Sequence, residues 1–413
     1  MSALLDLGRC RFCATPLRDS FVDLGMSPLS NAYPAASAVL APEMFFPLHA
    51  FVCHECFLVQ LHELQTPSEI FSEYAYFSSF STSWLAHCEA FAKAMVPRLG
   101  LGASSRVVEI ASNDGYLLKF FQAAGVEVLG VEPARNVAAE AIKAGVPTLV
   151  EFFGTAQAQR MVAAGQTADL LVGNNVLAHV PDLNDFVAGL ATVLAPEGVL
   201  SMEFPHLARL VEHNQFDTIY HEHFSYLSLV TVERVFAHHG LRVFDVEELP
   251  THGGSLRVIA CRHGAAHAQT GKVEALRARE VADGFTKLET YRGFARRVID
   301  TKCALLEFLI GARREGKRVV GYGAPAKGNT LLNFCGVRQD LLEYTVDRNP
   351  YKQHRLLPGT RIPIRAPEEI SRTKPDYVLI LPWNLRHEIT AQLAEIRGWG
   401  GKFVVPIPSV EIF

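Results

Sequence analysis

The side chains best suited to acid–base chemistry form one short run, YHEHFSY at Tyr220–Tyr226. Histidines, a carboxylate and two phenols so close together can supply a base, a group that orients it and a donor to a developing oxyanion. Zinc binding of the HExxH kind is disfavoured, because histidines two residues apart point to different faces of a helix. A histidine-rich polar surface segment is the alternative. We expect the run to carry acid–base chemistry.

Half of the cysteines are paired in the sequence. Four of the eight form two CxxC pairs, which are Cys10 with Cys13 and Cys53 with Cys56. Two CxxC turns offer four thiolates, the ligand set of closed tetrahedral zinc sites that leave no position for water or substrate. Two redox pairs, or a site that uses His49 or His54, are the alternatives. We expect structural zinc, which would also hold the long loop between the pairs.

The segment RVVEIASNDG at Arg106–Gly115 reads as an apolar strand followed by a small turn before a helix. In open α/β sheets ligands bind beyond the carboxyl ends of the strands, where small residues let the backbone approach them. Glu132 ends the next strand and is placed to accept hydrogen bonds from ribose hydroxyls, whether of S-adenosylmethionine or of NAD. The first turn lacks the GxGxxG glycines that seat a pyrophosphate, so S-adenosylmethionine is favoured. The expected cofactor-binding residues are Glu109, Ala111, Asn113, Gly115, Glu132, Asn174, Asn175 and His179.

A second glycine-rich turn, GYGAPAKGNT at Gly321–Thr330, follows a strand and opens a helix. A glycine turn at a helix N-terminus that also carries a lysine, Lys327, is a natural seat for phosphate or diphosphate. Its spacing is neither GxGxxG nor the P-loop. Asp347 ends the next strand as a ribose-binding acid would, which keeps NAD binding open. Pro382-Trp383-Asn384 occupies the equivalent loop of a later strand.

These residues must be positioned by alternating strands and helices. Alternation of this kind predicts parallel, doubly wound sheets. Expected strands of the first sheet span 105–110, 127–131, 169–173 and 198–204, followed by an antiparallel pair at 242–247 and 255–261. The edge pair favours a class I methyltransferase over a plain nucleotide-binding fold. Expected strands of a second α/β unit span 318–322, 342–346, 377–381 and 402–406.

The fold class is therefore α/β with three domains, since 413 residues exceed one compact core. We predict a small N-terminal zinc-binding module (1–67), a central class I methyltransferase sheet (68–285) and a C-terminal Rossmann-like domain (286–413). A net charge of −4 gives no electrostatic reason to expect nucleic acid. No apolar run is long enough for a membrane span and no signal peptide is evident, so a cytoplasmic protein is expected. We also expect a monomer.

Taken together, these motifs resemble the zinc-containing nucleotide-sugar C-methyltransferases of deoxysugar biosynthesis, which add a methyl branch at C3 or C5 of a TDP-4-keto sugar. The resemblance covers the whole chain: the two CxxC pairs, VEIASNDG, YHEHFSYLS, GYGAPAKGNT and LPWN. It implies structural zinc, S-adenosylmethionine in the middle domain, and a TDP-sugar held between domains. Such enzymes serve antibiotic or surface-glycan pathways, and C3 is the expected site.

The resemblance also implies roles for individual residues. His223 corresponds to the general base, with Tyr220 and Glu222 as supporting catalytic groups. Lys327 and Asn384 correspond to ligands of the nucleotide sugar, and Tyr76 to a tyrosine that contacts the substrate. We add Tyr226 as a second phenol able to contact the substrate and stabilise an enolate.

Removal of a proton beside the ketone must precede attack of that carbon on a sulfonium methyl, which explains the need for a base. The rival enzyme is an O- or N-methyltransferase acting on the same nucleotide sugars. A rival of another class is a zinc-containing sugar-nucleotide binding protein with a degenerate methyltransferase fold, against which the intact motifs argue.

Overall fold

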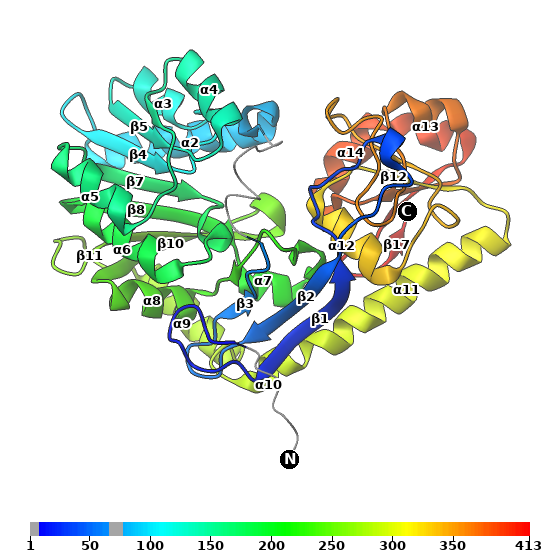
Figure 1. The fold of residues 1–413 in the computed structure, drawn as a ribbon, viewed down its shortest axis with the longest axis horizontal. Coiled ribbons are helices and arrows are strands. Elements are labelled where there is room, and N and C mark those ends of the chain that lie inside the picture. Colours follow the sequence, from blue (N-terminus) through cyan, green and yellow to red (C-terminus); the bar gives the residue numbers. More distant parts are fainter. Residues whose placement is uncertain (1–7, 66–76) are drawn as a thin grey trace. The chain divides into compact units, whose positions relative to one another are not determined.

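The computed structural model describes residues 8–65 and 77–413. It divides into two compact units, each assembled from stretches that are distant in the sequence (Figure 1). Unit 1 comprises Met1–Arg18, Cys53–His206 and Phe224–Lys287, and unit 2 comprises Asp19–Val52, Leu207–His223 and Leu288–Phe413. The contiguous ranges 1–67, 68–285 and 286–413 stay a prediction.

Unit 1 contains a seven-stranded sheet of order β10-β11-β8-β7-β4-β5-β6. Neighbouring strands from β8 to β6 are parallel, whereas β11 runs antiparallel to both of its neighbours. The predicted parallel sheet with an antiparallel edge hairpin is thus confirmed. The strand bounds are β4 (Arg106–Ile110), β5 (Glu127–Val131), β6 (Thr148–Leu149), β7 (Ala168–Asn174), β8 (Leu194–Pro205), β10 (Leu241–Leu249) and β11 (Ser255–Arg262).

The central strands of this sheet read as valine-rich runs because both of their faces are covered by helices. Helix α2 (Thr82–Leu99) starts where the Ser81 side chain accepts a hydrogen bond from Trp84 N, and it stops at Gly100 in the left-handed conformation. The other helices of unit 1 are α3 (Leu118–Ala123), α4 (Arg135–Lys143), α5 (Thr155–Ala163), α6 (Leu183–Val193), α8 (Leu229–His238) and α9 (Gly271–Ala282).

Unit 2 contains a six-stranded sheet of order β14-β13-β12-β15-β16-β17, parallel except for β17. Strand β12 lies beside β15 although two strands separate them in the sequence, so the chain reverses its direction of winding between them. The strands are β12 (Val319–Tyr322), β13 (Thr345–Val346), β14 (Ile364–Arg365), β15 (Tyr377–Ile380), β16 (Lys402–Val405) and β17 (Glu411–Ile412). The helices of unit 2 are α7 (Leu207–Glu212), α10 (Leu288–Arg292), α11 (Phe294–Arg314), α12 (Ala326–Cys335), α13 (Glu368–Thr373) and α14 (Arg386–Gln392).

The stretch between the two CxxC pairs packs with the C-terminal sheet. Strands β1 (Asp19–Ser27) and β2 (Phe46–Val52) form an antiparallel pair in unit 2. The connection between them contacts the C-terminal part of the chain through a bridge from Ala35 to Arg355 and an ion pair between Glu43 and Arg361 at 2.8 Å. Another short antiparallel pair, β3 (Val59–Leu61) with β9 (Ser225–Tyr226), belongs to unit 1.

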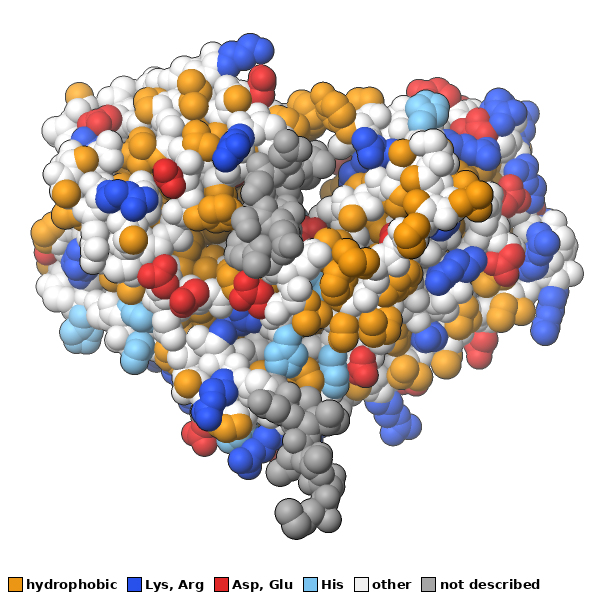
Figure 2. All heavy atoms as spheres, viewed as in Figure 1, with side chains coloured by type: hydrophobic (Ala, Val, Ile, Leu, Met, Phe, Trp, Pro, Cys, Tyr) orange, Lys and Arg blue, Asp and Glu red, His pale blue; other side chains and the backbone are white. Residues whose placement is uncertain are grey.

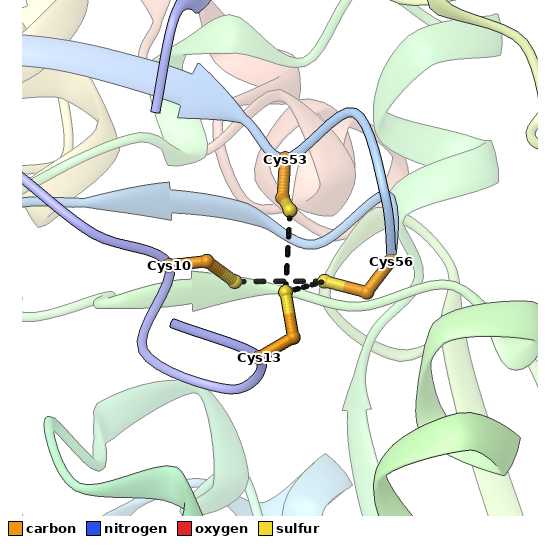
Figure 3. A group of neighbouring side chains, drawn as sticks. All are labelled: Cys10, Cys13, Cys53 and Cys56. Atoms are coloured by element: carbon orange, nitrogen blue, oxygen red, sulfur yellow. Dashed lines mark hydrogen bonds between the residues drawn. The ribbon is translucent and has the colours of Figure 1, made fainter. Parts of the chain in front are cut away.

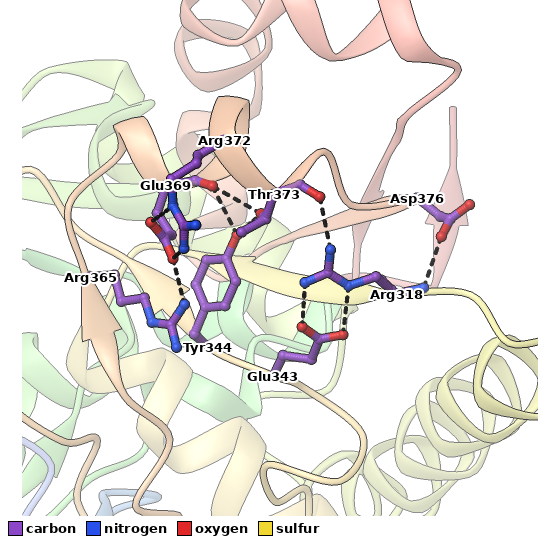
Figure 4. A network of polar contacts seen from close by, with 8 residues as sticks. All are labelled: Arg318, Glu343, Tyr344, Arg365, Glu369, Arg372, Thr373 and Asp376. Atoms are coloured by element: carbon purple, nitrogen blue, oxygen red, sulfur yellow. Dashed lines mark hydrogen bonds and ion pairs between the residues drawn. The ribbon is translucent and has the colours of Figure 1, made fainter.

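A network of ion pairs and hydrogen bonds in unit 2 links residues that precede β12, β13 and β15, and it extends to the end of β14 and into α13 (Figure 4). Arg318 precedes β12 and donates to both carboxylate oxygens of Glu343, at 2.7 and 3.0 Å, while its backbone N–H donates to Asp376 at 2.9 Å. Glu369 accepts from Arg365 and Arg372 in the same network. These contacts join successive strands at one edge, which leaves the opposite, carboxyl edge for a ligand site.

The surface carries charges of both signs. On the face drawn in Figure 2, basic and acidic side chains are interspersed, in line with the formal net charge of −4. Within residues 8–65 and 77–413, no helix combines the length and the apolar character that a bilayer crossing requires.

Candidate functional site

The four paired cysteines converge in unit 1 (Figure 3). Cys10 Sγ lies 3.5 Å from Cys56 Sγ, and Cys13 Sγ lies 3.5 Å from Cys53 Sγ and 3.7 Å from Cys56 Sγ. Sulfurs bound tetrahedrally to zinc at ~2.3 Å are about 3.8 Å apart, and a disulfide would be far shorter. The cluster therefore fits one zinc ion held by four thiolates.

Two similar backbone turns present these thiols. Cys10 O accepts from Ala14 N and Cys53 O accepts from Phe57 N, both at 2.9 Å, and Ala14 and Phe57 each adopt positive φ. A buried amide, Gln60 Nε2, donates to Cys10 Sγ at 3.2 Å. Such a donor stabilises a thiolate ligand, and it is a contact that the CxxC spacing does not reveal.

The predicted cofactor-binding residues gather at the carboxyl edge of three adjacent strands, β4, β5 and β7. The turn after β4 needs left-handed backbone at Ala111, Asn113 and Gly115 (φ 57°, 49° and 75°). A Cβ on Gly115 would lie 2.9 Å from Val146 Cγ2, so both conformation and packing require glycine there.

Glu132 ties this turn to the end of β5. Its carboxylate accepts Asn113 N at 2.9 Å and Ala134 N at 2.8 Å, and burial raises its pKa. Each oxygen keeps a lone pair for a ligand hydroxyl. Glu109 lies inside β4 and is fully buried, and this burial raises its pKa well above the ordinary range.

The remaining predicted cofactor residues follow β7. Asn174 is its last residue, Asn175 has positive φ and donates its backbone N–H to Glu203 O at 2.7 Å, and His179 ends the short helix η3 (Leu177–His179). The side chain of Asn175 contacts His252 Nε2 at 3.2 Å. All three therefore border the same edge as Glu132.

A buried charge cluster at the end of β8 was missed by the sequence analysis. Glu203 accepts from Arg257 at 2.7 Å, contacts His87 Nε2 at 2.9 Å and accepts from Thr251 at 2.9 Å. Burial opposes its ionisation, but these partners outweigh burial and lower the pKa of Glu203 to about 2. The cluster joins α2 to the edge hairpin beside the predicted cofactor residues.

In unit 2, two of the predicted substrate residues, Lys327 and Asn384, meet at the carboxyl ends of β12 and β15. This is the point at which the chain reverses its direction of winding through the sheet. Lys327, in the first turn of α12, donates to Asn384 Oδ1 at 2.9 Å and lies 4.4 Å above the Trp383 ring. Asn384 and Trp383 belong to η6 (Trp383–Leu385). A Cβ on Gly323 would lie 2.5 Å from Pro382 Cδ, so glycine permits the close approach of the two loops.

The YHEH residues also belong to unit 2, and their contacts define the state of His223. Its Nδ1 lies 3.1 Å from Thr218 O and its Nε2 lies 2.8 Å from Tyr220 Oη. A carbonyl only accepts, so Nδ1 carries the hydrogen in the neutral ring. The lone pair of Nε2 is then available and receives the hydrogen bond of Tyr220.

Glu222 is held by a distant residue. Asn31 Nδ2 donates to both of its carboxylate oxygens, at 2.8 and 2.9 Å. Burial raises the pKa of Glu222 to about 7, although Asn31 and the charge of Lys352 act in the opposite direction. A carboxyl that changes charge near neutrality, beside a histidine with a directed lone pair, is typical of an acid–base site.

His221 has a structural role in this segment. Its Nε2 lies 3.2 Å from Pro47 O, which can only accept a hydrogen bond, so this nitrogen is the donor in the neutral ring. Burial lowers the pKa of the ring. His221 therefore connects the YHEH run to β2.

Helix α12 anchors both segments that bring these groups together. Thr330 Oγ1 donates to Ile219 O at 2.9 Å, just before Tyr220, and Asn329 Nδ2 donates to Ser30 O at 2.6 Å, just before Asn31. Both side chains are buried. The helix that carries Lys327 thus also fixes the backbone on which the YHEH run and Asn31 depend.

Lys352 and Tyr33 border the loop between β12 and α12. Tyr33 Oη and Lys352 Nζ donate to Ala324 O at 2.6 and 2.8 Å, and the ammonium lies 4.9 Å from the Tyr33 ring. Asp347 accepts Ala324 N at 2.7 Å. Both backbone groups of Ala324, its N–H and its C=O, are therefore held by hydrogen bonds, which fixes the loop after β12.

Two predicted substrate residues lie elsewhere. Tyr226 is buried on β9 in unit 1, and Tyr76 falls outside the described residues. The residues that sequence reasoning missed in unit 2 are Asn31, Tyr33, Asp217 and Lys352. The unusual length of the stretch between the CxxC pairs was the available signal for the first two.

Three family models match in order: "Putative zinc binding domain" over residues 10–71, "Methyltransferase domain" over 84–246, and "C-methyltransferase C-terminal domain" over 250–408. The C-methyltransferase NovU of Streptomyces niveus is 37% identical over 98% of this chain and 97% of its own.

Solved structures resemble part of the chain. The PH0226 protein of Pyrococcus horikoshii OT3 is 15% identical, covers 47% of this chain and 97% of its own, and gives a TM-score of 0.36. Magnesium protoporphyrin IX methyltransferase (ChlM) of Synechocystis PCC 6803 is 16% identical over 44% of this chain and 81% of its own, with a TM-score of 0.32.

The sheet order, the thiolate cluster and the matching family models define an S-adenosylmethionine-dependent methyltransferase with a zinc-binding domain. The match along nearly the whole length of a C-methyltransferase narrows this class: the chain belongs to the C-methyltransferase family. The predicted fold class, enzyme class and cofactors are thereby confirmed.

Proposed function

We propose that this enzyme transfers a methyl group from S-adenosylmethionine to the carbon beside the ketone of a TDP-linked 4-keto deoxysugar, at C3 rather than C5. The observation that carries the proposal is the directed Nε2 lone pair of His223, fixed by Thr218 O on the other side of the ring. Lys327, whose ammonium group can bind a phosphate, lies in the same unit. The similarity to NovU supports carbon as the acceptor.

His223 removes the proton. Its Nε2 takes the hydrogen from the carbon next to the ketone, the imidazole becomes an imidazolium, and the electron pair moves onto the ketone oxygen. Tyr220 keeps the lone pair oriented until substrate arrives and then donates its O–H to the enolate oxygen. Thr218 O stabilises the imidazolium through Nδ1–H, as a carboxylate does in other histidine bases.

Each unit has a distinct task in this reaction. The bound sulfonium cofactor supplies an electrophilic methyl group. In unit 1, Glu132 and the turn at Ala111–Gly115 bind the ribose and adenosine part of the cofactor. In unit 2, Lys327 and Asn384 bind the diphosphate, which orients the sugar relative to His223. The four thiolates hold structural zinc and take no part in the chemistry.

The test is a reaction with a panel of TDP-4-keto sugars carrying deuterium at C3. We expect release of S-adenosylhomocysteine, loss of the deuterium and a new carbon-bound methyl group located by NMR. Retention of deuterium with a methyl on oxygen or nitrogen would assign the rival O- or N-methyltransferase activity. Binding of the sugar nucleotide with no transfer to any member of the panel would favour a binding protein.

A further inference from the structure

Asp217 is a buried acid that the proposed reaction does not use. It lies in η4 (Phe216–Thr218), three residues before Tyr220, and is fully buried. One carboxylate oxygen, Oδ2, accepts from Trp383 Nε1 at 2.7 Å. The other, Oδ1, has no hydrogen-bond partner among the described residues. A buried carboxylate oxygen without a donor is costly unless it is protonated or a ligand completes it.

The surroundings of Asp217 point to an anion site. Trp383 donates its indole N–H to Asp217, and the ammonium of Lys327 lies over its ring, so one side chain contacts both the acid and the lysine. Lys327 on α12 is the charged group that acts on Asp217, and the contact from η6 is the neutral Trp383. Within η4, the backbone N–H groups of Asp217 and Thr218 also act on the carboxylate, and like Lys327 and Trp383 they lower its pKa. Burial raises the pKa of Asp217 to about 6, and it lowers the pKa of Lys327.

We propose that Asp217 takes up one proton from solvent when the diphosphate of a nucleotide sugar binds at Lys327, and that the neutral carboxyl then offers its O–H to the ligand through Oδ1. The inference rests on the proposed function, because it uses Lys327 as the diphosphate seat. A bound diphosphate engages the charge of Lys327 and adds negative charge nearby, and both effects favour the protonated acid. The site thereby gains a donor without a second buried cation.

The sign of the pH dependence follows from this linkage. The acid is more readily protonated in the complex than in the free enzyme, so nucleotide affinity rises as pH falls from the pKa of the complex toward that of the free enzyme. Between the two values the dissociation constant changes by up to about tenfold per pH unit for one linked proton. Below about pH 6 the acid is protonated in both states and the dependence disappears.

The experiment is calorimetric titration of the full-length enzyme with TDP-glucose. This probe has a hydroxyl at C4 and does not react, and its diphosphate stays fully ionised near neutrality. The observed enthalpy is measured at about pH 7 in buffers of different ionisation enthalpy, whose slope gives the number of protons taken up. We expect uptake approaching one proton in the wild type and none in Asp217→Asn, which keeps an acceptor for Trp383 and donates its own amide N–H to the ligand.

The possible outcomes separate this inference from the proposed function. Tight binding without proton uptake by the wild type overturns the inference and leaves the nucleotide site intact. No binding of TDP-glucose overturns the nucleotide site at Lys327 and the inference with it. Uptake that persists in Asp217→Asn but disappears in Glu222→Gln assigns the proton to Glu222 and also overturns the inference.

Discussion

Glu132 and Asp347 perform the same structural task in the two sheets. Glu132 accepts Asn113 N from the turn after β4 and Ala134 N, two residues further along its own segment, at 2.9 and 2.8 Å. Asp347 accepts Ala324 N from the turn after β12, and Asn349 N two residues further along, at 2.7 and 2.8 Å. In each sheet an acid that directly follows one strand thus closes the turn after the neighbouring strand, at the edge of the sheet where we propose that ligands bind.

Glu132→Ala should weaken S-adenosylmethionine binding. The substitution removes the carboxylate proposed to accept the ribose hydroxyls and frees the turn at Asn113, so a loss of ~1.5–3 kcal/mol, about tenfold to a hundredfold in the dissociation constant, is expected. Titration calorimetry measures the dissociation constant of S-adenosylmethionine. The matched control is Asp347→Ala, which alters the equivalent acid of unit 2 and should leave this affinity nearly unchanged. Equal effects of the two variants would contradict a cofactor site at Glu132.

His223→Asn should lower turnover by the ~10²–10⁴ typical of a general base. Asparagine keeps polarity and approximate size but cannot accept the proton, so both ligands should still bind. The variant should also fail to exchange the α hydrogen of the substrate with deuterated water in the absence of S-adenosylmethionine, wherever the wild type performs that exchange.

Tyr220→Phe is the comparison that locates the base. Phenylalanine removes the donor to the enolate but leaves the Nε2 lone pair of His223 unobstructed. We expect slower turnover with hydrogen exchange still detectable by NMR. If Tyr220→Phe or Glu222→Gln abolishes turnover while His223→Asn retains it, the base is one of those neighbours.

Glu222→Gln should stabilise the protein at high pH. The pKa of Glu222 is raised from 4.5 to about 7 in the folded state, so the folded state binds the proton more tightly and stability falls as pH rises through this interval. The full penalty, on the order of 3 kcal/mol, applies above about pH 7 and is absent below about pH 4.5. Denaturant unfolding at several pH values measures the gain. Glu368→Gln, an exposed carboxylate of the same unit, is the control.

About one zinc ion per chain should be found by metal analysis of the purified protein. Cys53→Ser should lose the metal and damage folding more than the chemical step, because the binding energy of a structural site is folding energy. Cys303→Ser replaces an exposed cysteine outside the cluster and should change neither zinc content nor thermal unfolding. Full folding and activity in zinc-free protein would refute a structural role.

Lys327→Ala should raise the Michaelis constant for the TDP-sugar and leave S-adenosylmethionine affinity nearly untouched. The substitution removes the cation proposed to pair with the diphosphate, while Asn384 and Trp383 keep their backbone positions in η6. Initial rates at varied concentrations of each substrate distinguish the two effects. A cocrystal with NAD at this loop would show that the lysine has another ligand.

Local sequence determined much of this protein. Four thiols in two CxxC turns specify a tetrahedral site wherever the turns meet, because each turn is built from a few adjacent residues. Valine-rich strands and small turn residues likewise predicted the carboxyl edges at Ala111–Gly115 and Glu132, since strand periodicity and turn conformation are local properties.

Only the tertiary structure decided which distant side chains complete the site. Asn31 reaches Glu222 across 191 residues of sequence, and Trp383 reaches Asp217 across 166. Neither spacing nor composition predicts these two contacts, because they depend on the path of the chain in space. They also depend on α12, which anchors the backbone just before Asn31 and just before Tyr220. The grouping of Tyr220, Glu222 and His223 with the C-terminal sheet has the same origin. Burial, which sets the pKa of Glu222 and Asp217, exists only once these segments have packed together.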